Sequence, residues 1–414
     1  MPLETPAFER LDTLLGKYGE EGDQLLFRLL KRGEKLEAVL AQEGQARVDD
    51  LADFGLRYDL TVPLARVVAA HQGQLPRYFR RYQMQPVWRA DRPQRGRFRE
   101  FVQCDVDFVG TTSPLAEVEV FSAVSSALHG LGFGDVTCRI NDRRILSAFL
   151  EVAGVPESAQ GDVLTRLDKL DKIGPEEVRA AWRGLELPAA VVDELDALLG
   201  LASSTSALEA IRKRFEASGH ASGVEGVQTL EGLLRLLGET QTDVALRFDL
   251  SLVRGLSYYT GPIFELGVAD LAGSLGGGGR YDGLIGMFCG QEIPAVGFSL
   301  GFERLVVVME ERGMFEVMAP PPGIFLARLD EEVDDILVRL ASAWRRAGLQ
   351  VEVHPEASKL KKQLAYAASL GVRYVGMIGK REAREGFVTV KDLHSGEQRV
   401  LGQEDVPSWL RSTL

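Results

Sequence analysis

Five arginine side chains fall within one short segment of the chain, at Arg89, Arg92, Arg95, Arg97 and Arg99. The planar guanidinium group binds phosphate oxygens through two parallel hydrogen bonds, which explains why arginine rather than lysine dominates here. Acidic and amide side chains follow along the same stretch, as far as position 107. We therefore predict a site for a phosphorylated ligand accompanied by a small cation.

The residues after these arginines alternate between polar and apolar. The odd positions are mainly polar, namely Arg97, Arg99, Phe101, Gln103, Asp105 and Asp107. The even positions are mainly apolar, namely Phe98, Glu100, Val102, Cys104, Val106 and Phe108. Because successive side chains of a strand point to opposite faces, the pattern predicts a strand with its chemistry on one face and the protein core on the other. A solvated edge hairpin is the disfavoured alternative, because scattered charge would not sort by position in this way.

The run from Pro93 to Gly96 interrupts this alternation. Proline, glycine and short polar residues are typical of turns, so the run predicts the connection between two antiparallel strands. The arginines would then lie on a hairpin, with the acidic residues along its second strand.

The composition limits the partners that this chain can have. With 60 acidic and 48 basic residues among 414, the net charge is −12, which excludes a uniformly basic nucleic-acid surface. Any RNA contact is therefore local, and DNA is not an expected partner. No apolar run approaches the length of a membrane span, and the first residues lack the basic region and apolar core of a signal peptide. We expect a cytoplasmic protein without a membrane partner.

The cysteines and histidines form no metal-binding pattern. Cys104, Cys138 and Cys289 lie far apart and belong to no CxxC pair, which argues against a structural zinc site and a disulfide framework. Cys104 falls on the apolar positions of its expected strand, where a small buried thiol is ordinary. The five histidines are scattered, without an HExxH motif. No metal site on the protein itself is expected, and any metal ion should arrive with the substrate.

The expected secondary structure changes three times along the chain. Residues 1–154 mix strands with short helices, and Ser113 to Leu131 has the apolar spacing of an amphipathic helix. Residues 155–239 are charged and helix-rich, which indicates a helical insertion, because strand-like sequence resumes in residues 240–318. After a proline cluster, residues 323–414 alternate strand and helix, which predicts a small, mainly parallel α/β domain.

Several motifs resemble those of the class II aminoacyl-tRNA synthetases. Trp88 to Asp91 with Arg97 to Phe101 looks like the second class motif, and Gly297 to Arg304 looks like the third. Three further segments are similar to the two signatures and the anticodon-binding domain of the histidyl-tRNA synthetase family: Leu56 to Thr61, Leu252 to Tyr259, and Leu360 to Ala367 continued by Val388 to Leu393. The wording from Arg57 to Pro63 resembles the eukaryote-like branch of that family.

This resemblance implies a fold, a reaction and partners. The expected fold class is α+β, with an antiparallel sheet flanked by helices, a helical insertion and a C-terminal α/β anticodon-binding domain. The implied activity is that of a histidine–tRNA ligase, which activates L-histidine with ATP to histidyl-adenylate and pyrophosphate. It then transfers histidine to the 3′ end of tRNA(His). The resemblance also implies Mg²⁺ bound with ATP, and a homodimer.

The resemblance assigns roles around the ATP. Arg89 and Arg254 are the implied catalytic pair, which reaches the α-phosphate from opposite sides, because fixed cations stabilise the charge that builds on the phosphoryl oxygens. The implied ATP-binding residues are Arg89, Asp91, Arg97, Phe101 and Arg304, for the α-phosphate, the adenine amino group, the distal phosphates and the two faces of the base. No general base is required, because the attacking histidine carboxylate is already ionised.

A second group of residues is implied in histidine binding: Asp59, Leu60, Thr61, Arg89, Gln103, Asp107, Arg254, Tyr258 and Tyr259. Asp59 and Thr61, which share a strand parity, resemble the ammonium-binding pair, with Gln103 at the same end, because an ammonium group offers only donors. Asp107 is the implied acceptor for the imidazole N–H. Taken singly, Asp59 would be better explained as a strand carboxylate paired with Arg57, and the tyrosines as core aromatics.

A local basic cluster lies in the C-terminal segment, at Lys359, Lys361 and Lys362. The resemblance implies that this domain binds the anticodon stem-loop, and the cluster fits phosphate contacts with it, whereas a solvated helix face is the alternative.

Two features depart from the family pattern. The chain begins at what resembles the end of the first class motif, so we expect it to be N-terminally short. Ser257 stands where the family signature usually has an aspartate, and this change could weaken catalysis. Both departures keep open a different function, that of a non-catalytic paralogue acting as a regulatory subunit in histidine biosynthesis.

Overall fold

The computed structural model describes the whole chain except residues 42–46, 203–205, 241, 254–257, 318–322 and 414. It divides into two compact units, Met1–Arg312 and Gly313–Leu414, and each is considered by itself. Among the described helices, none is both long and apolar enough to cross a membrane.

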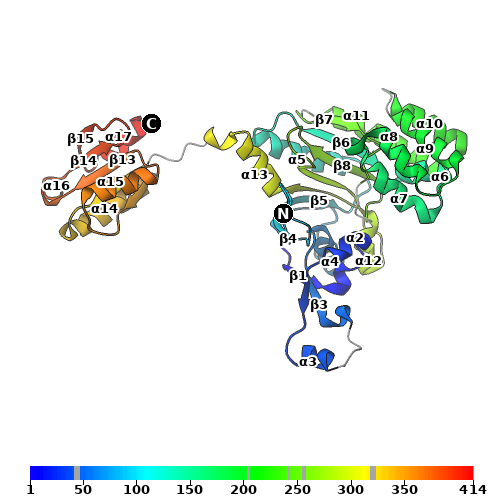
Figure 1. The fold of residues 1–414 in the computed structure, drawn as a ribbon, viewed down its shortest axis with the longest axis horizontal. Coiled ribbons are helices and arrows are strands. Elements are labelled where there is room, and N and C mark those ends of the chain that lie inside the picture. The colour runs from blue at the N-terminus through cyan, green and yellow to red at the C-terminus, as the bar shows by residue number, and fades with distance from the viewer. Residues whose placement is uncertain (42–46, 203–205, 241, 254–257, 318–322, 414) are drawn as a thin grey trace. The chain divides into compact units, whose positions relative to one another are not determined.

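A seven-stranded sheet forms the centre of the first unit (Figure 1), in the order β4-β5-β10-β9-β8-β6-β7. Its strands are β4 Phe79–Trp88, β5 Glu100–Val109, β6 Thr137–Asp142, β7 Ala245–Phe248, β8 Pro262–Gly267, β9 Gly276–Arg280 and β10 Ala295–Gly301. All neighbouring strands are antiparallel except β6 and β7. The expected antiparallel sheet is therefore confirmed.

Helices cover this sheet and extend beyond it. The helices α5 Leu115–Gly130 and α13 Phe302–Glu311 both pack against β5 and β10. Two further helices, α4 Thr61–His71 and α12 Asp282–Cys289, pack against each other and share an apolar core with the ends of β4 and β5. The helix that was predicted from Ser113 to Leu131 is confirmed as α5.

The helix-rich segment of the sequence forms a group of helices beside β6 and β7, drawn in green in Figure 1. It consists of α7 Glu157–Leu167, α8 Leu170–Arg183, α9 Ala189–Ala202, α10 Ala207–Ser218 and α11 Ala221–Gly238. The preceding helix, α6 Arg143–Val152, packs against α11 and joins this group to the sheet.

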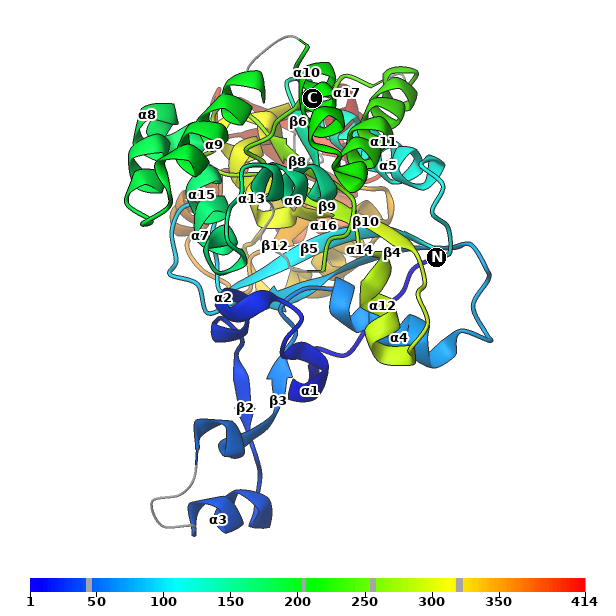
Figure 2. The ribbon, with the colours of Figure 1, turned by 90° about the vertical axis from the view of Figure 1, so that its right-hand side faces the viewer.

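A small sheet of order β1-β3-β2 precedes the central one in sequence. Its strands are β1 Phe8–Arg10, β2 Arg28–Leu30 and β3 Ala52–Leu56, and α1 Leu11–Leu14 and α2 Gly19–Gln24 lie between the first two. Between β2 and β3, the helix α3 Glu34–Leu40 and a 3₁₀ turn at Val48–Leu51 lie away from the body of the unit (Figure 2). The chain returns from it directly into the residues that precede α4.

The second unit is built on a five-stranded sheet of order β12-β11-β13-β14-β15. Its elements are β11 Gly323–Arg328, α14 Asp334–Arg346, β12 Gln350–Val353, α15 Leu360–Ser369, β13 Tyr374–Ile378, α16 Lys380–Glu385, β14 Phe387–Asp392, β15 Gln398–Gly402 and α17 Val406–Thr413. Short 3₁₀ turns lie at Met314–Val317 and Glu331–Val333.

The expectation of a mainly parallel sheet in this unit is only half right. The strand β11 is parallel to β12 and β13, whereas β14 and β15 run antiparallel to their neighbours. The reversal follows from the short helix α16, which ends at Gly386 with a φ of 78° and leaves no long crossover of the kind that parallel strands need.

The predicted strand after the arginines begins later than expected and buries the opposite face. It starts at Glu100 rather than Arg97. Its polar residues Gln103, Asp105 and Asp107 are buried, whereas the apolar positions Val102, Cys104 and Val106 are only half-buried. The predicted core assignment of this strand, including a buried Cys104, was therefore wrong.

The neighbouring strand explains this reversal. In the β4–β5 pairing, Arg81 lies opposite Asp107 and Gln83 lies opposite Asp105, and both β4 residues are buried. Buried charges are tolerated where they are paired and hydrogen-bonded, so two matched polar strands can face inwards together.

Candidate active site

One cavity of about 310 Å³ opens above the polar face of β5 and β10. Ten of the predicted residues line it: Asp59, Thr61, Arg89, Asp91, Arg97, Phe101, Gln103, Tyr258, Tyr259 and Arg304. Leu60 and Asp107 are buried and do not line it. Arg254 and Ser257 lie outside the described residues.

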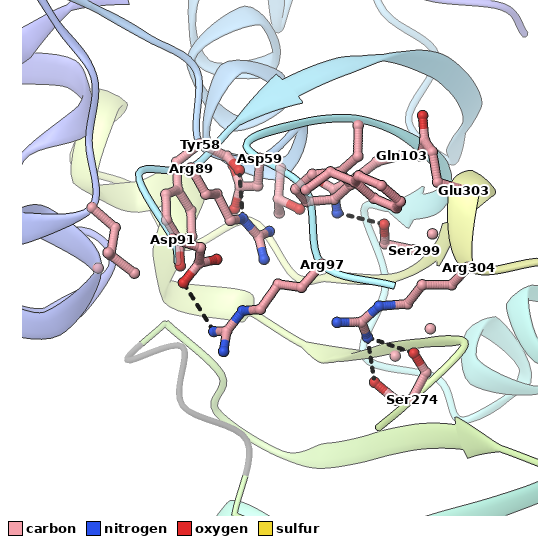
Figure 3. A pocket seen from close by; sticks show the side chains of 18 of the residues that line it. Tyr58, Asp59, Arg89, Asp91, Arg97, Gln103, Ser274, Ser299, Glu303 and Arg304 are labelled. Carbon is pink, nitrogen blue, oxygen red and sulfur yellow. Dashed lines mark hydrogen bonds and ion pairs between the residues drawn. The ribbon is translucent and has the colours of Figure 1, made fainter. Parts of the chain in front are cut away.

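Arg89 is held between two aromatic rings at one end of this cavity. Its guanidinium carbon lies 4.2 Å from the ring centre of Tyr58 and 5.1 Å from that of Phe101, and its Nε donates to the Tyr58 carbonyl at 3.1 Å. Its terminal nitrogens form no hydrogen bond with another described residue, and the side chain lines the cavity beside Asp91 and Arg97 (Figure 3). Aromatic faces stabilise and orient a guanidinium, so a fixed cation is presented to an anionic ligand.

Only two of the five clustered arginines line the cavity. Arg89 and Arg97 do, whereas Arg95 pairs with Glu311 at an exposed position. The Nε of Arg99 donates to the Asp91 carbonyl at 3.1 Å, and Arg92 is exposed. The prediction of one five-arginine phosphate site was therefore too broad, because the segment from Arg92 to Arg99 is a turn whose side chains diverge. Its tight bridge joins Gln94 and Arg97.

Arg97 and Asp91 form an ion pair across the cavity mouth, with Nη2 and Oδ1 3.0 Å apart. The Arg97 side chain is 46% exposed. The sequence assigned these two residues to different parts of ATP, the distal phosphates and the adenine amino group. ATP therefore competes with this ion pair for the two side chains.

The first turn of α13 holds the hairpin in place. Both carboxylate oxygens of Glu303 accept the Val102 amide, at 3.0 and 2.9 Å. The Arg304 Nε donates to the Gly96 carbonyl at 2.8 Å, and its Nη1 donates to the Ser274 carbonyl at 2.5 Å. Glu303 and Ser274 were not predicted as site residues, although Glu303 lies within the third class motif, directly before Arg304.

Asp59 is fully enclosed by donors from the protein. Its Oδ1 accepts the Tyr18 hydroxyl at 3.2 Å and the Val62 amide at 3.0 Å, and its Oδ2 accepts the Tyr258 hydroxyl at 2.9 Å. Burial raises the pKa of Asp59, and these hydrogen bonds oppose the rise. Tyr18 was missed, because its segment shows no periodicity that would point to the site.

The predicted strand containing Asp59 and Thr61 does not exist. Asp59 lies in the connection after β3, and Thr61 is the first residue of α4. The alternative pairing of Asp59 with Arg57 is also absent, since Arg57 donates to the carbonyls of Thr5 at 2.6 Å and Pro86 at 2.9 Å. The capping bond from the Val62 amide explains why a helix rather than a strand begins here.

Gln103 lines the cavity with only one end of its amide bonded. Its Nε2 donates to the Ser299 hydroxyl at 2.6 Å, while Oε1 is buried without a partner among the described residues. Ser299, on β10, was not predicted as a site residue, although it lies within the third class motif.

Asp107, the predicted ring acceptor, is instead bonded beneath the cavity wall. Its Oδ1 accepts the Tyr281 hydroxyl at 2.5 Å, and its Oδ2 lies 2.8 Å from the Arg81 Nε. A side chain at Gly297 would place its Cβ 2.0 Å from that Oδ1, so glycine is required there. Arg81 and Tyr281 were missed, although Arg81, Gln83 and Gln85 repeat on β4 the alternation that was noticed on β5.

Tyr258 and Tyr259 also line the cavity. Tyr258 is buried and Tyr259 half-buried, with their ring centres 5.0 Å apart in an edge-to-face arrangement. The glycine run forms β9 behind them. A Cβ at Gly278 would lie 2.1 Å from the Gly297 carbonyl oxygen, so strand packing requires glycine at this position.

Comparison with known proteins shows which family of sequences and structures the chain resembles. The family profile described as "Histidyl-tRNA synthetase" matches residues 2–305, and the profile "Anticodon binding domain" matches residues 306–413. A "Histidine--tRNA ligase" from Phocaeicola vulgatus is 38% identical, with 98% of this chain and 90% of the relative covered. One from Gloeobacter violaceus is 39% identical, with 96% and 88% covered.

A solved structure agrees with these sequence matches. The crystal structure of histidyl-tRNA synthetase from Nostoc sp. PCC 7120 has a TM-score of 0.75 and 28% identity, and the alignment covers 100% of this chain and 91% of that one. The relatives named here are bacterial, so they do not support the predicted eukaryote-like branch. Both domain profiles, the long alignments and the shared class II fold lead to one conclusion: the chain belongs to the histidyl-tRNA synthetase family.

Proposed function

We propose that this chain is a histidine–tRNA ligase whose cavity binds ATP at the arginine hairpin and histidine at the far end of β5. The observation that carries the proposal is that residues far apart in sequence, from Asp59 to Arg304, line one cavity in a chain that matches the family over both domains. The products of the first step are histidyl-adenylate and pyrophosphate. In the second step a ribose hydroxyl at the tRNA 3′ end attacks the adenylate carbonyl and releases AMP.

Arg89 is assigned to the α-phosphate and the substrate carboxylate. The attacking carboxylate and the phosphoryl oxygens are both anionic, so a fixed cation between them lowers the barrier both by positioning and by stabilising charge. Stacking between Tyr58 and Phe101 holds the guanidinium before ligand arrives, which avoids reorganisation during the reaction. Arg254, the second implied catalytic arginine, keeps its proposed role without a geometric argument, because it lies outside the described residues.

ATP enters as its Mg²⁺ complex in this proposal. Each acidic side chain of the cavity that the structure describes is already engaged: Asp59 by two tyrosines, Asp91 by Arg97 and Glu303 by the Val102 amide. The described residues also contain no group of three or more metal-ligating side chains. Magnesium commonly binds through substrate phosphates and water, which fits delivery with the nucleotide. Arg97 then binds the distal phosphates after leaving Asp91, and Arg304 supports the adenine.

Histidine is proposed to bind between Gln103 and the two tyrosines. The Oε1 atom of Gln103, which has no hydrogen-bond partner among the described residues, is a suitable acceptor for the ammonium group. Asp59 and Thr61 are proposed to lie at the same end of the substrate, and they line the same cavity. Leu60 supports this end through its carbonyl, which accepts Arg81 at 3.2 Å. Asp107 is proposed to serve the imidazole N–H with Tyr281 as its intermediary, because the Tyr281 hydroxyl occupies one oxygen of that carboxylate.

The C-terminal unit is proposed to bind the anticodon stem-loop of tRNA(His). Lys359, Lys361 and Lys362 are all exposed at the start of α15. Phosphate contacts contribute binding that weakens with salt, with a slope of about −0.7 per contact for single strands. Replacing the three lysines with alanine should lower the charging of tRNA and flatten its salt dependence. Pyrophosphate exchange, which needs no tRNA, should stay unchanged, and a loss of exchange would contradict this assignment.

A homodimer in the cytoplasm completes the proposal. The outer side of β4 leaves Tyr82 and Met84 47% and 63% exposed, next to the half-buried Val102, Cys104 and Val106 of β5. An exposed apolar sheet face of this kind suits a subunit interface. Met84→Glu should shift the protein towards monomers in light scattering coupled to size exclusion, and an unchanged mass would reject this face as the interface.

Exchange of labelled pyrophosphate into ATP is the decisive test of the catalytic assignment. Purified protein with MgATP and histidine should support exchange, and Arg254→Ala should abolish it while the fold is retained. Absence of exchange from well-folded wild-type protein would favour the regulatory paralogue. Exchange without charging of tRNA(His) would keep the activation step and reject the transfer step.

A further inference from the structure

Gln103 presents a buried oxygen to the cavity because its other end is bonded. The Nε2 group donates to Ser299 Oγ at 2.6 Å, a bond drawn in Figure 3, and both residues line the cavity. The Oε1 atom is buried and has no partner among the described residues, and the residue is only 8% exposed. An unpaired buried acceptor is costly, so its partner should be a ligand donor.

A glutamine amide can also be turned over, which exchanges its oxygen for its nitrogen with almost no change of shape. The partner of the amide therefore decides which atom faces the ligand. A serine hydroxyl is ambiguous by itself, because it both donates and accepts. Something beyond Ser299 must fix the direction.

Asp105 supplies that direction. It lies directly opposite Ser299 in the β5–β10 pairing, and its Oδ1 is buried without a hydrogen-bond partner among the described residues. The Ser299 hydroxyl is a donor at the facing position, and it lowers the pKa of the Asp105 carboxyl. A carboxylate offers only acceptors, so Ser299 must give it the hydroxyl hydrogen. The Ser299 oxygen is then left as an acceptor, which takes an N–H of Gln103 and turns Oε1 towards the cavity.

We propose that Ser299 is a positioning residue for the amino-acid substrate. Because Ser299 donates its hydroxyl hydrogen to Asp105, its oxygen accepts an N–H from the Gln103 amide, and the Gln103 oxygen then faces the substrate ammonium group. This inference rests on the proposed binding of the ammonium by Gln103. In the opposite orientation the amide would present N–H donors to a group that has only donors. Ser299 thereby selects for an α-ammonium group without touching it.

The Asp105–Ser299–Gln103 chain of contacts, here called the relay, depends on whether Asp105 is ionised, and the charges around Asp105 influence its ionisation. Asp105 faces Arg81, with Nη2 and Oδ2 3.8 Å apart, and it also interacts with the carboxylates of Asp107 and Asp59. Burial, opposed by Arg81, raises the pKa of Asp105 to about 7. A protonated Asp105 would donate to Ser299 instead of accepting from it. The relay therefore favours the ammonium group most strongly above neutral pH.

The test compares two ligands that differ only in the ammonium group, L-histidine and 3-(imidazol-4-yl)propionate, by calorimetric titration of the full chain. Losing one hydrogen-bonded orientation should weaken histidine binding about tenfold in Ser299→Ala. Binding of the des-amino analogue should not change. Ser299→Thr, which keeps the hydroxyl, should bind histidine as the wild type does. Equal losses for both ligands, or no loss for either, would overturn the proposal.

A second variant reverses the direction of the Ser299 hydrogen bonds rather than removing them. In Asp105→Asn the new amide can donate to Ser299, so Ser299 would donate to Oε1 and the Gln103 nitrogen would face the substrate. Discrimination between the two ligands should fall further than in Ser299→Ala. Combining both substitutions should cost no more than Ser299→Ala alone, and additive losses would contradict a shared relay.

These outcomes remain separate from those of the proposed function. Wild-type protein that lacks pyrophosphate exchange would reject the catalytic assignment, whereas the ratio of histidine to analogue affinity would still judge Ser299. Exchange at saturating histidine should keep its rate in Ser299→Ala, with the defect confined to the histidine KM. A fall in rate at saturation would reject a role limited to substrate positioning.

Discussion

Two adjacent arginines on β4, Arg81 and Arg80, allow a comparison of how much stability is lost when a buried and an exposed ion pair are broken. The Arg81 side chain has no exposed surface, and its nitrogens lie 2.8 Å from Asp107 and 3.8 Å from Asp105. Arg80 is 53% exposed and pairs with Glu119, which is 49% exposed. Arg81→Met and Arg80→Met therefore remove the same group from neighbouring positions of one strand, and only the first leaves buried charges without a partner.

The expected difference is large. Removing one partner of a buried ion pair costs about 3–5 kcal/mol, because the remaining charge stays buried and uncompensated. An exposed pair contributes about 0–1 kcal/mol. Since about 1 kcal/mol moves the melting temperature of a large domain by roughly 2 °C, Arg81→Met should lower the calorimetric transition of the first unit by about 6–10 °C. Arg80→Met should move it by about 2 °C or less.

The deficit of Arg81→Met should also depend on pH in a defined direction. The pKa of Asp105, about 7, lies above its ordinary value of 3.8, so the folded state binds more protons between these limits. Its contribution to stability therefore falls as pH rises from about 4 to about 7. Arg81 lowers the pKa of both Asp105 and Asp107, so its removal raises them further. The deficit should be larger at pH 8 than at pH 5, where protonation removes the charge of Asp105.

Two results would refute this reasoning. Equal shifts for the two variants would mean that burial does not decide the cost. A deficit in Arg81→Met that is independent of pH would mean that lost packing, rather than uncompensated charge, destabilises the protein. Arg81→Met combined with Asp105→Asn should recover part of the loss, because one of the two stranded charges is then absent.

Three further changes test other parts of the site. Arg89→Lys keeps the charge but loses the planar group held between aromatic rings, so the pyrophosphate exchange rate should fall about 100-fold while the melting temperature stays unchanged. Asp91→Ala should raise the KM for ATP about tenfold if Asp91 accepts the adenine amino group, with an unchanged KM rejecting that role. Gly278→Ala should lower the unfolding free energy by about 1–3 kcal/mol, whereas Gly283→Ala, with no atom within 4 Å of the new Cβ, should not.

Local patterns in the sequence predicted most of the elements. The helix α5 lies close to its expected bounds, and residues 323–378 alternate strand and helix as expected, because apolar periodicity reports directly on which side of an element is buried. The strand β15 was missed, since its first three residues are exposed at the sheet edge and carry no such signal. The direction of β14 was missed too, because it depends on the length of a connection rather than on the strand itself.

Site residues could be predicted from the sequence where they belong to a recognisable motif. Arg89, Phe101 and Arg304 lie within motifs, and the structure brings them to one cavity. Tyr18 and Tyr281 were not found, because each contributes a single hydroxyl from a distant segment to a buried carboxylate. No periodicity encodes such a contact, and only the folded chain places the hydroxyl beside its acceptor.

The inverted burial of β5 has a consequence for how this cavity selects its ligand. A polar layer buried beneath a cavity is stabilised only if nearly every donor finds an acceptor, so each side chain in it has one allowed direction. Asp107 directs the Tyr281 hydroxyl, and Asp105 directs Ser299 and through it Gln103. The acidic residues of the strand therefore act mainly by orienting the neutral groups that face the ligand. An alternating pattern of acidic and amide residues on adjacent strands indicates such an orienting layer, rather than a row of direct ligand contacts.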